Sequence, residues 1–91
     1  MKSPSFSLTI RGEVWTVRME APPKEPRKRR PVGLCNYTDR LIYVTPGPQQ
    51  DTILRHETIH AQCPWMNEAE VEALETALYE SDMQIRHLGC P

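Results

Sequence analysis

Two histidines and a glutamate stand in the segment His56-Glu57-Thr58-Ile59-His60, which has the spacing H-E-x-x-H. Residues four apart lie one above the other on the same face of an α-helix. Two imidazoles at that spacing can bind one zinc ion, and the glutamate beside the first of them can reach a metal-bound water. The pattern therefore predicts a zinc site on a helix, with His56 and His60 as ligands and Glu57 as the general base.

A catalytic zinc ion takes three protein ligands and keeps one position for water, so a third ligand must come from another segment. Glu68 is our first choice, because it opens a predicted second helix only eight positions after His60. Glu72 and Glu75 follow one and two turns further along that helix and stay open as alternatives. Glu70 is expected to serve in the cap of the helix instead.

Two other ligand sets also stay open. Cys63 lies one turn after His60 and would join both histidines if the first helix continued that far. His87 and Cys90, near the C-terminal end, would close a site of four protein ligands. A closed site of this kind is structural rather than catalytic, and Glu57 would then have no role as a base.

An open site would support hydrolysis of a peptide bond. Glu57 would accept a proton from the attacking water and pass it to the leaving amine, while the metal polarises the carbonyl. An exposed edge of the strand predicted at 41–44, directly before the metal helix, would align an extended peptide. Three side chains stay open as a further hydrogen-bond donor to the oxyanion: Tyr37, Tyr43 and His87.

Two helices are predicted to position these groups. The first covers about residues 49–62 and ends there, because the residue before a proline disfavours the helical region and Cys63-Pro64 follows. The second covers about residues 68–87 and starts with a capping box formed by Asn67 and Glu70. Its apolar residues share one face at helical spacing. They are Val71, Leu74, Leu78 and Ile85.

The remaining elements are predicted to be strands. Apolar and polar residues alternate over 6–11 and again over 14–19 around a glycine turn, which is typical of a β-hairpin with Trp15 in the core. A turn-rich segment at 33–40 precedes a short strand at 41–44. Together these elements predict an α+β fold, in which a small and mainly antiparallel sheet packs on the zinc-bearing helix and a long C-terminal helix.

Length and composition indicate one small domain over residues 1–91. A chain of 91 residues lies near the lower limit for a self-sufficient core, and a bound metal would add to its folding free energy. We expect neither a signal peptide nor a membrane span, because the first residues have no apolar core and the sequence has no long apolar run. Three cysteines at irregular spacing argue against a disulfide framework. We therefore expect a cytoplasmic protein.

Residues 20–31 are predicted to form a loop with four prolines and five basic side chains. Proline fixes φ and removes a backbone donor, which excludes a central strand or a helix interior. The basic side chains predict a weak contact with a nucleic acid or another anionic partner, and a solvated connector is the competing interpretation. They are Lys24, Arg27, Lys28, Arg29 and Arg30.

On these residues the chain resembles the zincins, and more closely the small SprT-like or minimal H-E-x-x-H metallopeptidases of phage and bacterial genomes. The resemblance follows the order of hairpin, the Gly33-Leu34-Cys35-Asn36 turn, the strand at 41–44, the motif segment at 52–61 and the helix start at 67–71. It implies zinc as the cofactor and Glu57 as the base. The ligands it implies are His56, His60 and an acidic residue matching Glu68. A phage-encoded protein of this kind would act in the cytoplasm of its bacterial host.

The leading predicted function is therefore a zinc-dependent peptidase that acts on a protein or peptide. The alternative is a non-catalytic binding module, in which zinc stabilises the fold and the basic loop at 24–30 contacts a nucleic acid or a protein partner. The sequence predicts no contact with a membrane, and it leaves the substrate and the oligomeric state open.

Overall fold

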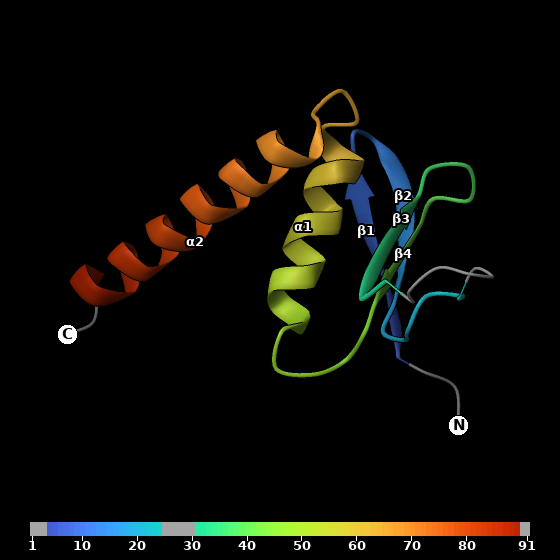
Figure 1. The fold of residues 1–91 in the computed structure, drawn as a ribbon, viewed down its shortest axis with the longest axis horizontal. Coiled ribbons are helices and arrows are strands. Elements are labelled where there is room, and N and C mark those ends of the chain that lie inside the picture. The colour runs from blue at the N-terminus through green and yellow to red at the C-terminus, as the bar shows by residue number, and fades with distance from the viewer. Residues whose placement is uncertain (1–3, 25–30, 90–91) are drawn as a thin grey trace.

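A computed structural model describes residues 4–24 and 31–89. The strands, in chain order, are β1 (Ser5–Ile10), β2 (Glu13–Arg18), β3 (Gly33–Asn36) and β4 (Leu41–Val44). The helices are α1 (Gln50–Gln62) and α2 (Glu68–Gly89). The molecule thus has the predicted α+β fold, and both predicted helices, the hairpin and the strand at 41–44 are present (Figure 1).

The four strands form one mixed sheet in the order β1-β2-β4-β3. The hairpin β1–β2 is antiparallel and pairs Phe6 with Val17 and Leu8 with Trp15. β3 and β4 are also antiparallel, whereas β2 and β4 run parallel. The sheet is therefore mainly antiparallel, and its one parallel pairing joins β2 and β4, which are not consecutive in the chain.

Two expectations for the middle of the chain were wrong. Gly33–Asn36 is not part of a turn but a strand, β3, whose extended conformation is stabilised by its pairing with β4. The strand at 41–44 does not offer an exposed edge, because β4 lies between β2 and β3. The edge strand beside α1 is therefore β3.

The hydrophobic core lies between the sheet and α1. Alternate side chains of the strands point to this face, which follows from the two-residue period of an extended chain. Ile53 and Leu54 of α1 are partly buried and pack against the core. Trp15 is buried, as predicted, and meets Tyr37 edge to face with ring centroids 6.0 Å apart. The buried cluster consists of Ile10, Trp15, Val17, Ile42, Val44 and Ala61.

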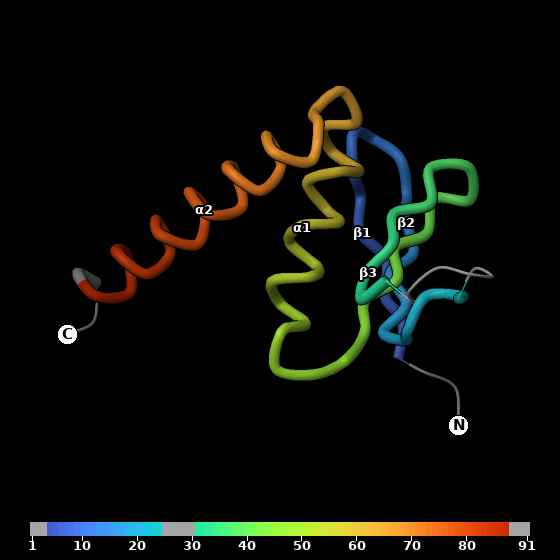
Figure 2. The backbone as a smooth tube through the Cα atoms, in the orientation of Figure 1, coloured from blue at the N-terminus to red at the C-terminus, as the bar shows by residue number. Residues whose placement is uncertain are grey.

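α2 packs on α1 near its own N-terminal end and then extends away from the domain (Figures 1 and 2). Val71 is fully buried and Leu74 partly buried, whereas Leu78 and Ile85 are 42% and 67% exposed. The predicted apolar face of α2 is therefore covered only over its first turns. Neither helix in the described part of the chain is both long and apolar enough to cross a lipid bilayer.

The predicted basic loop is described only at its two ends. Residues 20–24 and Pro31 have no regular secondary structure, and Lys24 is exposed. The four consecutive basic residues at 27–30 lie outside the described residues.

Candidate metal centre

α1 presents both histidines of the motif on one face. The Nε2 atoms of His56 and His60 are 3.2 Å apart, and their rings meet edge to face with centroids separated by 4.8 Å. The helix ends at Gln62, as the following Cys63-Pro64 predicts, and Cys63 is its C-cap residue. One turn of helix therefore brings two imidazole nitrogens to the same place.

Glu68 lies at the first position of α2 and faces both histidines. The predicted capping box is present, since the backbone N–H of Glu70 donates to Asn67 Oδ1 at 2.8 Å and that of Asn67 donates to Glu70 Oε1 at 3.0 Å. This cap holds the first turn of α2 in place. Glu68 Oε1 then lies 2.5 Å from His56 Nε2, and Glu68 Oε2 lies 3.1 Å from His60 Nε2.

The chemistry of these three donors fits a zinc ion. Two ligands placed tetrahedrally at zinc–nitrogen distances of about 2.0–2.1 Å are separated by about 3.3 Å. The observed separations of 3.2 Å between the histidines and 3.1 Å between His60 and Glu68 are close to that value, whereas the 2.5 Å between His56 and Glu68 is shorter and would have to widen around an ion. One ligand atom from each residue lies within 4.8 Å of the others. Three donors are also the number that a catalytic zinc site uses.

The other proposed ligands lie apart from this group in the described part of the chain. Glu72 is exposed on α2 and does not join the three donors, and neither does Cys63. His87 lies nineteen positions after Glu68 on the same helix, which corresponds to a rise of about 28 Å. Cys90 lies outside the described residues.

Glu75 contacts His56 through the other ring nitrogen. Its Oε2 lies 2.7 Å from His56 Nδ1, and its side chain is only 16% exposed. Burial lowers the pKa of His56, but the hydrogen bond to Glu75 and the charges of Glu68, Glu57 and Glu75 together outweigh it, so this pKa lies above its ordinary value. The sequence offered Glu75 only as a reserve ligand, because its contact with His56 depends on how the two helices cross.

The Glu57 side chain lies close to β3. A Cβ atom at Gly33 would lie 3.0 Å from Glu57 Oε2 and 2.6 Å from Ile53 Cγ2, so the strand crosses the helix here without room for a side chain. Burial raises the pKa of Glu57, although the neighbouring charges of His56 and His60 oppose the shift. A carboxylate with a raised pKa is better matched to proton transfer near neutral pH.

A cleft of ≈ 390 Å³ opens over the three donors and Glu57. A second hollow, of ≈ 410 Å³, shares Gly33, His56 and Glu57 with it and continues toward Val32 and Ile53. The cleft therefore has a polar part at the donors and a more apolar part next to it. The residues that line the first hollow are Gly33, Leu34, Cys35, Tyr37, His56, Glu57, His60 and Glu68.

Two neutral side chains of the β3 region complete the cleft. The hydroxyl of Tyr37 donates to the backbone carbonyl oxygen of His60 at 2.8 Å, which ties the last turn of α1 to the segment after β3. Burial raises the pKa of Tyr37 to about 12. Burial, with a contribution from the charge of Glu57, raises the pKa of Cys35 to about 11. Tyr37, Tyr43 and His87 were considered above as hydrogen-bond donors to the oxyanion, and of these three Tyr37 lines the cleft.

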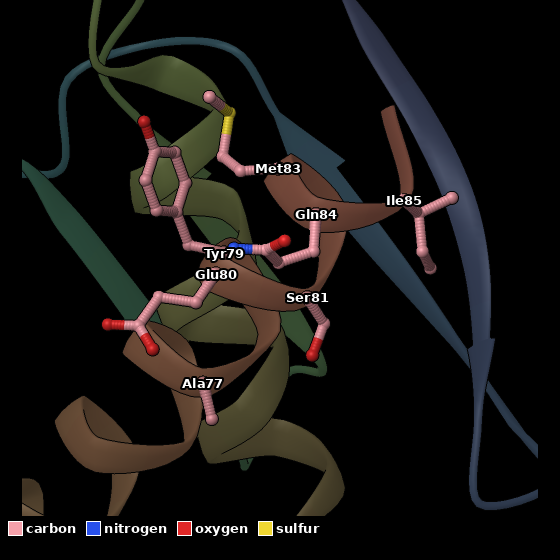
Figure 3. Close-up of a pocket in the computed structure, with 7 residues that line it drawn as sticks. All are labelled: Ala77, Tyr79, Glu80, Ser81, Met83, Gln84 and Ile85. Carbon is pink, nitrogen blue, oxygen red and sulfur yellow. The ribbon is translucent and has the colours of Figure 1, made fainter. Parts of the chain in front are cut away.

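A larger hollow, of ≈ 660 Å³, lies on the distal half of α2 and contains none of the candidate ligands. Tyr79 and Met83 extend to one side of the helix there, and Ile85 extends to another (Figure 3). All of its lining residues belong to one helix that projects from the domain. It is therefore a surface of α2, and the chemistry-bearing residues lie in the smaller cleft.

No protein-family model, curated protein or solved structure matches this chain. The resemblance to SprT-like or minimal H-E-x-x-H metallopeptidases thus stays a prediction from the motif and the order of elements. The case for a metal site rests on the geometry of His56, His60 and Glu68.

Proposed function

We propose that this protein is a zinc-dependent peptidase that hydrolyses a protein or peptide substrate. The supporting observation is the convergence of three donors, from His56, His60 and Glu68, beside a partly buried glutamate that lines the same cleft. Histidine nitrogens and a carboxylate oxygen are common ligands of catalytic zinc. The free thiols of Cys35 and Cys63 suit the reducing conditions of the cytoplasm, where we place the protein.

Zinc held by His56, His60 and Glu68 would polarise the scissile carbonyl and lower the pKa of water. Glu57 accepts a proton from the attacking water and delivers it to the leaving amine, a transfer that its raised pKa favours. The contact with Gly33 restricts the positions that the Glu57 carboxylate can occupy. Tyr37 holds the helix turn that carries His60 by its hydrogen bond to the carbonyl of that residue.

The substrate is expected to bind along β3. Val32 O accepts a hydrogen bond from Thr45 N at 2.9 Å, and bonded pairs alternate along an antiparallel ladder. The backbone groups of Gly33 and Cys35 therefore point to the outer edge, which no strand covers within residues 4–24 and 31–89. An extended peptide that pairs with this edge would run across the cleft.

A Glu57→Gln variant tests the proposal. Amide replacement removes the base but keeps size and shape, so we expect hydrolysis of a library of unstructured peptides to fall by about 10²–10⁴-fold while zinc is retained. Glu72→Gln, which changes an exposed carboxylate on α2, is the matched control and should retain full activity. Equal hydrolysis by the Glu57→Gln variant would contradict the proposal. No hydrolysis by the wild-type protein would favour the non-catalytic binding module.

A further inference from the structure

We propose that Glu75 is a positioning residue, which accepts the Nδ1 proton of His56 and thereby directs Nε2 of the same ring at Glu68 and His60. This inference rests on the proposed zinc site, since it concerns how that site is prepared. It also assigns Glu75 a role other than that of a zinc ligand.

The two nitrogens of His56 meet different partners. Nδ1 lies 2.7 Å from Glu75 Oε2, whereas Nε2 lies 3.2 Å from His60 Nε2 and 2.5 Å from Glu68 Oε1. A neutral imidazole carries a proton on one nitrogen and a lone pair on the other. A carboxylate faces each nitrogen, but a metal bound at Nε2 would displace any proton there, whereas the contact with Glu75 retains the proton on Nδ1.

The position of Glu75 is built by the packing of α2 on α1. Its side chain is 16% exposed, against 62% for Glu68, although both residues lie on the same helix. A carboxylate is costly to bury unless it has a partner, and His56 supplies one. The neighbouring Leu74 and the fully buried Val71 belong to the part of α2 that is covered by the domain. The contact between Glu75 and His56 therefore follows from the way α2 packs on α1.

The same geometry separates Glu75 from the three donors. The nitrogens of one imidazole lie on different edges of the ring, so a carboxylate bound at Nδ1 does not share an ion bound at Nε2. Glu75 also does not belong to the group formed by His56, His60 and Glu68. Carboxylates that hydrogen-bond a ligating histidine in this way orient the ring and raise its basicity.

The first experiment needs neither metal nor activity. In metal-free protein carrying Glu68→Ala, which removes the competing carboxylate at Nε2, long-range ¹H–¹⁵N spectra at a pH where His56 is neutral are expected to show the proton of His56 on Nδ1. In this background Glu75→Leu should shift the population toward the Nε2–H form, whereas Glu75→Gln, whose amide oxygen can still accept the proton, should retain the Nδ1–H form. Glu72→Leu is the matched control. An unchanged tautomer in the folded Glu75→Leu variant would overturn the proposal.

The second experiment measures zinc affinity by competition with a chelator. We expect a 10–100-fold weaker affinity for Glu75→Leu, a smaller loss for Glu75→Gln and no change for Glu72→Leu. Wild-type affinity in Glu75→Leu would refute the positioning role. A loss in Glu75→Gln as large as that in Glu68→Ala, with one oxygen fewer around zinc by X-ray absorption, would show that Glu75 is a ligand. A wild-type protein that binds no zinc would remove the proposed function, while the spectra of the metal-free protein still decide the role of Glu75.

Discussion

Replacing Gly33 with alanine would insert a methyl group where β3 crosses α1. The new Cβ would lie 2.6 Å from Ile53 Cγ2, 3.0 Å from Glu57 Oε2 and 3.1 Å from Glu57 Cγ. Contacts this short require the side chains of Ile53 and Glu57 to shift, or the strand and the helix to move apart. Gly33 is not one of the positive-φ glycines, which are Gly12 and Gly47, so the strain is steric and does not come from the backbone conformation.

The size of the effect follows from two opposing contributions. Overpacking a fitted contact costs about 1–3 kcal/mol, and the loss of glycine freedom in the unfolded chain returns about 0.4–1 kcal/mol. We therefore expect Gly33→Ala to lower the free energy of unfolding by about 1 kcal/mol, or about 4–8 °C in Tm for a domain of this size. The displaced Glu57 should lower kcat by up to about 10²-fold, since misplacement by about 1 Å has that effect.

Denaturant unfolding and peptide hydrolysis should be measured together, with Gly12→Ala as the control. Gly12 has φ of 78°, and a methyl group added there would have no atoms within 4 Å, so alanine at this position should cost about 1 kcal/mol through the backbone alone. The control should therefore lose stability but retain hydrolysis. If Gly33→Ala were as stable and as active as the wild type, the close approach of β3 to Glu57 would be refuted.

Three further predictions concern the cap, the core and a thiol. Asn67→Ala should cost about 1 kcal/mol of stability, and it should also weaken zinc binding in chelator competition because the cap holds the turn that carries Glu68. An unchanged zinc affinity would show that the cap does not position Glu68. In denaturant unfolding, Ile42→Ala should cost about 2–5 kcal/mol and Ile85→Ala less than about 0.5 kcal/mol, since their exposed fractions are 0% and 67%; similar losses would contradict this packing. Cys35 of the metal-free protein should react with iodoacetamide about 100-fold more slowly at pH 8 than a thiol with the ordinary pKa of 9.0. The reason is that the thiolate is the reacting form, and a thiol with a pKa of about 11 is much less ionised at pH 8. Its rate should rise as the pH approaches 11, and site-resolved mass spectrometry that shows an ordinary rate would contradict the raised pKa.

Features with a strong local signal could be predicted from the sequence. The H-E-x-x-H spacing places His56 and His60 together on any helix, and Cys63-Pro64 ends that helix where expected. The capping box of Asn67 and Glu70 defines the start of α2, and with it the place of Glu68. All of these depend on residues within one or two turns of each other.

Features that depend on how elements pack could not be predicted. β3 contains the turn formers Gly33 and Asn36, and it becomes a strand because it pairs with β4 and packs on α1. The contact between Glu75 and His56 depends on the crossing of two helices. The exposure of Leu78 and Ile85 has the same origin, because helical periodicity identifies an apolar face without showing how far a neighbour covers it.

X-ray absorption on the zinc-loaded protein, combined with its metal content, tests the central claim most directly. We predict one zinc ion per chain, bound by two imidazole nitrogens and a carboxylate oxygen, with an exchangeable water as the remaining ligand. A protein that stays empty in excess zinc, or a shell made of four protein ligands, would contradict the proposed peptidase.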